Sequence, residues 1–324
     1  MRVAMRAWWT VLCRYWENPP MNAGRYAPSP SGPLHLGNLR TALIAWALAR
    51  QTGRSFFLRI DDIDPGRDGA ADQQIRELER LGIDWDGPVY YQAKRRELYE
   101  EVLSDLQQRG LVFPCFCSRK DIREATRAPH MPPTHYPGTC LRLTDGERRE
   151  AMLSGKTPAL RLKPSVTQWS IDDDFVGRFT GPVDAFVLRR GDLWPAYNLA
   201  SVVDDIDLGV DQVVRGNDLL SSSPAQAYLT SLISDHPMTY VHVPLVLGPG
   251  GQRLAKRDGA VTMEDCEDLG LSTKAVFTML SASLNVPDCD TSKDFIRRFD
   301  LNKISAKPMR IIFEKTGIPY MNRA

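Results

Sequence analysis

Hydrophobic and polar positions in the first half of the chain alternate between the patterns of buried strands and of helices. Gly24–Pro28 and Ser55–Ile60 are short apolar runs, and the longer apolar segment Leu39–Arg50 lies between them. Two short buried runs joined by a segment of helical length are typical of a βαβ unit. The pattern therefore predicts an α/β fold with a parallel sheet.

Further helices and an inserted segment follow this unit. Ala70–Leu81 and Lys94–Gln108 have apolar positions at helical spacing, and each is followed by a glycine within two residues. From Phe113 to about Pro182 prolines replace helical periodicity, which predicts an inserted subdomain. Buried strand and helix patterns then return, at Asp184–Arg189, Tyr197–Asp204, Gln212–Arg215 and Val241–Leu247.

These patterns divide the chain into five expected segments. Residues 1–20 form a disordered or misassigned leader, because Met21 directly precedes the first motif. The expected domain segments are 21–112 and 183–260 for the two halves of the α/β domain, 113–182 for the insertion, and 261–324 for a short C-terminal helical segment.

Length, charge and cysteine content limit the protein class. A chain of 324 residues is long enough for two domains, or for one domain with an insertion and an appendage. The formal charge is +1, so a nucleic-acid partner would need a local basic surface. Six cysteines are too few for a disulfide framework, which favours a reducing cytoplasm. Ala7–Cys13 is too short for a membrane span, which needs roughly 20 apolar residues. We expect a soluble, cytoplasmic monomer.

A glycine-containing turn precedes the first long helix. Gly32 and Gly37 let the backbone approach a polyanion, and Asn38 is predicted to cap the helix. A helix N-terminus offers N–H groups to phosphate, and His35 stands where its imidazole would touch the same anion. By itself such a turn fits a plain strand-to-helix connection about as well as a nucleotide site.

The order of residues in this turn is more specific evidence than its composition. Ala27-Pro28-Ser29-Pro30-Ser31-Gly32 followed by His35-Leu36-Gly37-Asn38 resembles the first signature of class I aminoacyl-tRNA synthetases, in the glutamyl and glutaminyl branch. The resemblance implies a Rossmann-type parallel-sheet catalytic domain with an inserted zinc-binding subdomain. It also implies ATP with Mg²⁺ as cofactor, His35 as a catalytic residue, and ATP contacts at Pro28, His35, Gly37 and Asn38.

A second signature is expected near the end of the sheet. Arg253-Leu254-Ala255-Lys256-Arg257 resembles the family's Lys-Met-Ser-Lys-Ser, and alone it would read as a basic surface loop. Paired with the first signature, it would clamp a triphosphate from the opposite side. The resemblance implies Arg253, Leu254 and Lys256 as ATP contacts, with Lys256 catalytic.

Other matching segments imply glutamate as the amino acid. Arg25 and Arg215 are candidates for gripping its two carboxylates, because a guanidinium fork matches a carboxylate. Asp61-Asp62-Ile63-Asp64 resembles a family segment whose first acid holds the substrate amino group, and here that acid is one methylene shorter than the usual glutamate. The implied glutamate contacts are Arg25, Ala27, Ser29, Asp61, Tyr197 and Arg215. Asp204-Asp205-Ile206-Asp207 also resembles a family segment, for which we expect a structural or sugar-neighbouring role.

Three cysteines lie in the proline-rich insertion, where a metal would supply folding energy that a small core lacks. Three buried thiols are the alternative, and His135 is chemically the more usual fourth ligand. The resemblance implies a structural Zn²⁺ held by Cys115, Cys117, Tyr136 and Cys140.

The matching motifs extend from Arg25 to Lys256, and only residues 258–324 follow the second signature. That is too little for the helical anticodon-binding region of a complete glutamyl-tRNA synthetase. The shortened form resembles the branch that activates L-glutamate without tRNA and transfers it to queuosine in the anticodon of tRNA(Asp). Three alternatives remain: a minimal glutamyl-tRNA synthetase, another adenylate-forming enzyme, and a non-catalytic RNA-binding paralogue.

Overall fold

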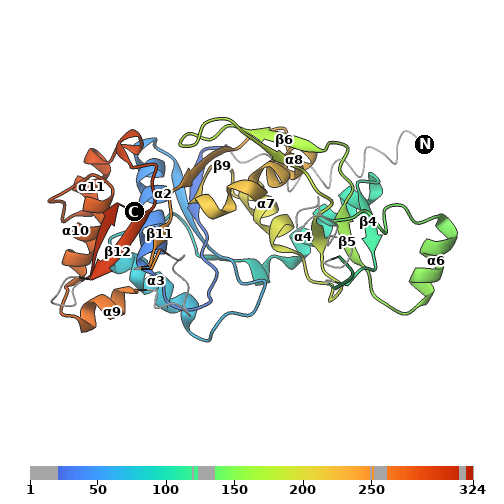
Figure 1. The fold of residues 1–324 in the computed structure, drawn as a ribbon, viewed down its shortest axis with the longest axis horizontal. Coiled ribbons are helices and arrows are strands. Elements are labelled where there is room, and N and C mark those ends of the chain that lie inside the picture. The colour runs from blue at the N-terminus through green and yellow to red at the C-terminus, as the bar shows by residue number, and fades with distance from the viewer. Residues whose placement is uncertain are drawn as a thin grey trace.

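A computed structural model describes residues 21–118, 120–122, 136–248, 250–251, 261–313 and 319–323. Its central sheet has five strands in the order β10-β9-β1-β2-β3, and every neighbouring pair is parallel. This confirms the predicted α/β fold (Figure 1). The strands are β1 (Ala23–Tyr26), β2 (Ser55–Ile60), β3 (Tyr90–Tyr91), β9 (Val210–Gly216) and β10 (Thr239–Val243).

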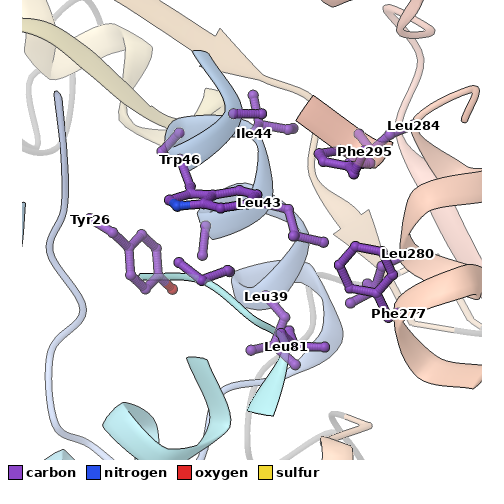
Figure 2. Close-up of a cluster of buried hydrophobic side chains, with 14 of the residues drawn as sticks. Tyr26, Leu39, Leu43, Ile44, Trp46, Leu81, Phe277, Leu280, Leu284 and Phe295 are labelled. Atoms are coloured by element: carbon purple, nitrogen blue, oxygen red, sulfur yellow. The ribbon is translucent and has the colours of Figure 1, made fainter. Parts of the chain in front are cut away.

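Helix α2 (Leu36–Gln51) lies at the centre of the largest apolar core. Twelve of its 16 residues are buried, because the sheet covers one side and C-terminal helices cover the other. Figure 2 shows Leu43 and Ile44 of this helix facing Leu280, Leu284 and Phe295. A helix that is apolar all round needs cover on both sides. The C-terminal segment therefore supports the helix that opens at the first signature.

The other helices of the α/β domain support the sheet and its edges. The predicted strand Ser55–Ile60 has the observed bounds, and the helices predicted at Ala70–Leu81 and Lys94–Gln108 agree within two residues at each end. Helix α2 begins three residues earlier than expected, and the helix predicted at Tyr197–Asp204 ends three residues later. The single strand predicted at Val241–Leu247 is wrong, because this segment divides between β10 and β11 (Val246–Leu247), which lie in different sheets. The helices are α3 (Ala70–Arg80), η1 (Gln92–Lys94), α4 (Arg96–Gln108), α7 (Tyr197–Asp207), η2 (Asn217–Ser222) and α8 (Ser223–Ile233).

The insertion contains a three-stranded antiparallel sheet in the order β4-β5-β8 and a two-stranded sheet of β6 and β7. Its helix α6 projects at the end of the molecule opposite the C-terminal helices (Figure 1). Strand β8 pairs with β5, so this small sheet includes residues on both sides of residue 182. The elements are β4 (Val112–Cys115), α6 (Asp145–Leu153), β5 (Ala159–Leu162), β6 (Gln168–Ile171), β7 (Phe179–Pro182) and β8 (Val187–Arg189).

The C-terminal segment is helical at first and ends in strands. Strand β12 (Met309–Phe313) pairs in parallel with β11 (Val246–Leu247) and antiparallel with β13 (Pro319–Arg323). Its buried residues Met309 and Ile311 alternate with partly exposed ones, a period-two pattern too short to stand out in the sequence. The preceding elements are α9 (Met263–Asp268), α10 (Thr273–Ser283), α11 (Ser292–Arg298) and η4 (Leu301–Lys303). Among the described residues, no helix is both long and apolar enough to cross a bilayer.

Candidate active site

One cavity of about 580 Å³ opens at the carboxyl ends of β1, β2 and β9. Open parallel sheets place ligands at this edge, because the connecting loops diverge there. Every predicted glutamate or ATP contact that falls within the described residues lines this cavity. They are Arg25, Ala27, Pro28, Ser29, His35, Gly37, Asn38, Asp61, Tyr197 and Arg215.

His35 caps α2, and the expectation that Asn38 would do so is wrong. The helix begins at Leu36, and the His35 Nδ1 accepts a hydrogen bond of 3.1 Å from the Asn38 backbone N–H. Asn38 is therefore already in the first turn. Because histidine is an uncommon cap, the sequence pattern favoured the asparagine.

The first turn of α2 leaves little room at Gly37. A Cβ there would lie 3.1 Å from the His35 ring and 3.2 Å from the Val246 Cβ. Gly32 has φ 142°, a conformation that favours glycine. The two glycines thus allow the tight turn predicted from the sequence.

Helix α3 is hydrogen-bonded to the turn of the first signature through two buried polar side chains that the sequence prediction missed. The Gln74 amide donates to the Gly32 and Ser29 carbonyls at 2.6 and 3.0 Å, and Glu77 accepts from the Leu34 N–H at 2.8 Å. Gln74 also lines the cavity. Polar residues three apart on the buried face of a helix were the available signal.

A buried ion network forms one wall of the cavity. Arg25 donates to Asp205 at 3.1 Å and to the Val214 carbonyl at 3.1 Å. Arg59, which the sequence analysis did not select, donates to Asp205 at 2.6 Å and to Asp61 at 2.7 Å. A fully buried arginine inside a strand signals such a network, since burying a lone charge is costly.

The carboxylate of Asp61 is buried beside this network. Burial raises its pKa to about 6, because desolvation outweighs the attraction of Arg59. Its own N–H donates to the Pro28 carbonyl at 2.9 Å, which fixes it beside the first signature. Asp61 therefore presents a carboxylate whose ionisation changes near pH 6.

The acidic segment on α7 is structural, as expected. Asp204 accepts from Arg95, Tyr99 and Gln92 at 2.7 to 2.9 Å and lies outside the cavity lining. Asp205 holds Arg25 and Arg59. These carboxylates position arginines and do not reach a ligand themselves.

Arg215 enters the cavity from β9, and Tyr197 enters from the start of α7. Arg215 is 7% exposed, and burial lowers its pKa from the ordinary arginine value. Tyr197 is 43% exposed and lines the cavity, so its side chain is accessible to a ligand. Two guanidinium groups, one carboxylate and one phenol thus share the space with the signature turn.

The second signature, with Arg253, Leu254 and Lys256, falls outside the described residues. The residues that follow it are described and touch the first signature. The Val261 carbonyl accepts from the Leu36 N–H at 2.9 Å, and Thr262 forms a bridge with His35. The described chain therefore resumes at Val261 directly beside the first signature.

The three predicted cysteine ligands converge in the insertion. The sulfur atoms of Cys115, Cys117 and Cys140 all lie within 4.8 Å of one another. The Tyr136 hydroxyl lies 3.5 Å from the Cys115 sulfur and accepts from the Cys140 N–H at 2.8 Å. His135 falls outside the described residues. Three sulfurs with an adjacent phenol oxygen fit the four-coordinate preference of zinc.

Burial and the neighbouring thiols raise the pKa of Cys117 to about 12. Zinc needs thiolates, so its binding would displace protons from this cluster. The Phe116 N–H donates to the Cys140 sulfur at 3.3 Å, and such bonds lower the pKa of Cys140 against the opposing effect of burial. The backbone thus already favours charge on one sulfur.

Comparison with known proteins agrees with this geometry. Residues 23–315 match the family described as tRNA synthetases class I (E and Q), catalytic domain. The Glutamyl-Q tRNA(Asp) synthetase of Nocardia farcinica is 51% identical over 286 residues, which cover 88% of this chain and 92% of that protein. The enzyme of the same name from Symbiobacterium thermophilum is 43% identical over 310 residues, covering 90% and 96%.

A solved structure is similar as well. The glutamate-tRNA synthetase of Elizabethkingia anophelis matches with a TM-score of 0.79 at 25% identity, covering 91% of this chain and 68% of that one. This chain therefore spans about two thirds of the length of that synthetase. Together the matches show that the chain belongs to the class I tRNA synthetase family for glutamate and glutamine, within the group of glutamyl-Q tRNA(Asp) synthetases.

Proposed function

We propose that this ligase activates L-glutamate with ATP, without tRNA, and transfers the glutamyl group to queuosine in the anticodon of tRNA(Asp). The observation that carries the proposal is the single cavity in which Arg25, Arg215, Tyr197 and Asp61 meet the His35 turn. The queuosine-containing acceptor is inferred from the activity for which these relatives are named.

Charge complementarity supports glutamate as the amino acid. Arg25 and Arg215 offer two guanidinium groups to the two carboxylates, and guanidinium binds carboxylate through paired hydrogen bonds. Asp61 offers its carboxylate, and Tyr197 its hydroxyl, to the ammonium group. Arg25 and Asp61 would make these contacts while paired with Asp205 and Arg59, whereas Arg215 has no carboxylate partner among the described residues.

The α-carboxylate of glutamate would attack the α-phosphorus of ATP in line and release pyrophosphate. It needs no general base, because it is already ionised at neutral pH. Catalysis is then positioning and stabilisation of charge on the phosphates. His35 and the α2 start at Gly37 would face these phosphates, with Lys256 approaching from the second signature.

Magnesium ion would neutralise phosphate charge when bound with ATP. Such ions are commonly held by substrate phosphates with few protein ligands. Asp61 is already bound to Arg59, which fits a site where the ion enters with the nucleotide.

We further propose that Cys115, Cys117, Cys140 and Tyr136 hold one structural zinc ion. The ligands would all come from the protein, leaving no open position for a reactant. Metal analysis of the purified protein tests this, with about one zinc per chain expected.

A minimal glutamyl-tRNA synthetase is the second candidate, and the fold match with the Elizabethkingia anophelis enzyme favours it. Such an enzyme would load the 3′ end of tRNA. Acylation of total tRNA with labelled glutamate, followed by ribonuclease A digestion, separates the two activities, because a loaded 3′ end is released as glutamyl-adenosine whereas glutamate on the anticodon stays on an oligonucleotide.

The test is glutamate-dependent ATP–pyrophosphate exchange without tRNA, followed by transfer of labelled glutamate to tRNA(Asp) with and without queuosine. We expect exchange, and transfer only to the queuosine form. Tyr197→Phe should raise the glutamate KM, while the matched surface variant Tyr320→Phe should not. Exchange that requires tRNA, or transfer independent of queuosine, would contradict the proposal.

A further inference from the structure

Three buried polar side chains, those of His242, Ser223 and Asp173, form a chain of contacts that ends at Arg215 and lies outside the cavity lining. His242 on β10 pairs in register with Arg215 on the neighbouring parallel strand β9, so both side chains share a face of the sheet. The His242 Nδ1 lies 2.6 Å from an oxygen of Asp173, and its Nε2 lies 2.8 Å from the Ser223 Oγ. Asp173, Ser223 and His242 are at most 5% exposed.

This order of groups matches that of a Ser-His-Asp hydrolytic triad, but the surroundings exclude that chemistry. Ser223 is fully buried and absent from the cavity lining, so no substrate reaches its Oγ. Arg215 Nε donates to the His242 Nε2 at 3.1 Å, which occupies the lone pair that would take the serine proton. The three residues therefore serve Arg215 instead.

The hydrogen bonds identify which imidazole nitrogen carries the proton. A guanidinium only donates, so its bond to the His242 Nε2 favours an unprotonated Nε2. In a neutral imidazole the proton is then on Nδ1, where it donates to Asp173. A protonated imidazolium would place an Nε2–H against the Arg215 N–H.

Asp173 is held as the matching acceptor. Its carboxylate also accepts the backbone N–H groups of Phe175, Val176 and His242 at 2.8 to 3.0 Å. Burial would raise its pKa, but these bonds, with that from the His242 ring, lower it overall. Burial lowers the pKa of His242, in keeping with a neutral ring.

The remaining contacts of Arg215 are also with neutral groups. Its Nη2 donates to the Ser223 Oγ at 2.7 Å, and its guanidinium carbon lies 5.5 Å from the Tyr240 ring centre. Within the described parts of the chain, Arg215 has no carboxylate partner, whereas Arg25 pairs with Asp205. Arg215 is thus fixed in direction while its charge is left for a ligand in the cavity.

We propose that Asp173 and His242 are positioning residues. Asp173 holds His242 in the Nδ1–H tautomer, and His242 thereby orients Arg215 toward a substrate carboxylate. The inference rests on the proposed function for the identity of that substrate. The tautomer itself is a property of the free protein and is tested without substrate.

The first test is a long-range ¹H–¹⁵N correlation spectrum of protein labelled at its histidines. The chain has five, and the spectrum of His242→Gln assigns the His242 signals by their loss. We expect a protonated Nδ1 and an unprotonated Nε2 at neutral pH. A protonated Nε2, or an imidazolium, would overturn the proposal whether or not the enzyme uses glutamate.

The second test is kinetic. His242→Leu removes the acceptor, and we expect the glutamate KM to rise about 10- to 100-fold, with the ATP KM nearly unchanged. His242→Gln retains an amide oxygen able to accept from Arg215 and should recover part of this loss. Ser223→Ala should raise the glutamate KM less, because the His242 contact remains.

His236→Gln is the matched control, since this half-buried histidine lies outside the cavity lining. Its KM values should equal those of the wild type. Equal rises in the glutamate and ATP KM values for His242→Leu, or equal losses for the Leu and Gln variants, would indicate a merely structural role and refute the positioning role. Wild-type protein that lacks glutamate-dependent exchange but shows the expected tautomer would refute the proposed substrate alone.

Discussion

The cavity and the cysteine cluster gather polar groups in opposite ways. At the cavity, Arg25 and Arg59 meet Asp61 and Asp205 inside the protein, so each of these four buried charges has a partner supplied by the chain. In the insertion, three thiols face one another with a phenol and no cation among their hydrogen-bond partners in the described residues.

This difference shows which interactions make each region rigid. The cavity wall is preorganised by ion pairs and by the apolar core around α2, before any ligand arrives. The cysteine cluster has a core of few residues and converges on a point that an external ion would fill. The cavity wall should lose stability when one residue of the ion network is replaced. The insertion should lose stability when its metal ion is removed.

The largest expected effect is on the ion network. Arg59→Met leaves buried carboxylates without their partner and should lower the free energy of unfolding by about 3–5 kcal/mol. Urea unfolding measures it. Arg54→Met is the control, because its ion pair with Asp211 is partly exposed to solvent and should contribute about 1 kcal/mol or less. Equal losses would mean that the buried network is not special.

Loss of one thiol should remove the metal from the cysteine cluster and destabilise the insertion. Cys140→Ser should reduce bound zinc from about one per chain to below about 0.1, since a hydroxyl is a poor ligand beside two thiolates. Hydrogen exchange should then increase in β4 and β5 but not in α2. Cys266→Ser, a buried cysteine outside the cluster, should keep its zinc. Increased exchange in α2 of Cys140→Ser would show that the regions are coupled.

Lowering the pH should change two properties that depend on Asp61 in opposite directions: it should increase the stability of the fold and weaken glutamate binding. Its raised pKa of about 6 means that the folded chain binds this proton more tightly than the unfolded chain. The stability contributed by Asp61 therefore rises as pH falls from about 6 to about 4. Over the same range the site loses its anion, so the glutamate KM should rise up to about tenfold per pH unit.

The comparison variant is Asp61→Asn. It should bind glutamate weakly at every pH and lack this contribution to the pH dependence of unfolding. A glutamate KM for wild type that stays constant from pH 7 to pH 5 would contradict the proposed contact of Asp61 with the substrate ammonium group.

The smallest expected effect compares two glycines at the second position of a helix. Gly37→Ala would crowd the His35 ring, so the ATP KM should rise about fivefold to tenfold with little change in stability. Gly146→Ala in α6 meets nothing within 4 Å and should be neutral or stabilising by about 0.5 kcal/mol. Steady-state kinetics and thermal unfolding measure the two. Identical outcomes would remove the steric argument for Gly37.

Much of the fold was predictable because it depends on local patterns. The apolar runs of Ser55–Ile60 and Ala70–Leu81 identified their elements closely. The start of α2 was missed by three residues, because the capping hydrogen bond comes from an imidazole. The terminal strand pair was missed because its pairing with β11 involves residues about sixty positions earlier in the chain.

By itself, the sequence determined the parallel α/β fold, the two signatures and ten of the residues that line the cavity. These are properties of short segments, and their order along the chain carries the resemblance to the family. The cysteine cluster was likewise visible from residue type and spacing.

Only the tertiary structure decided which charges are satisfied and which are left for a ligand. Arg25 and Asp205 are 180 residues apart, Arg59 and Asp205 are 146 apart, and His242 and Asp173 are 69 apart. No local pattern encodes such pairs, because packing of the strands brings them together. Arg25 and Arg215 look equivalent in the sequence, yet one is paired with a carboxylate and the other is held by a neutral imidazole.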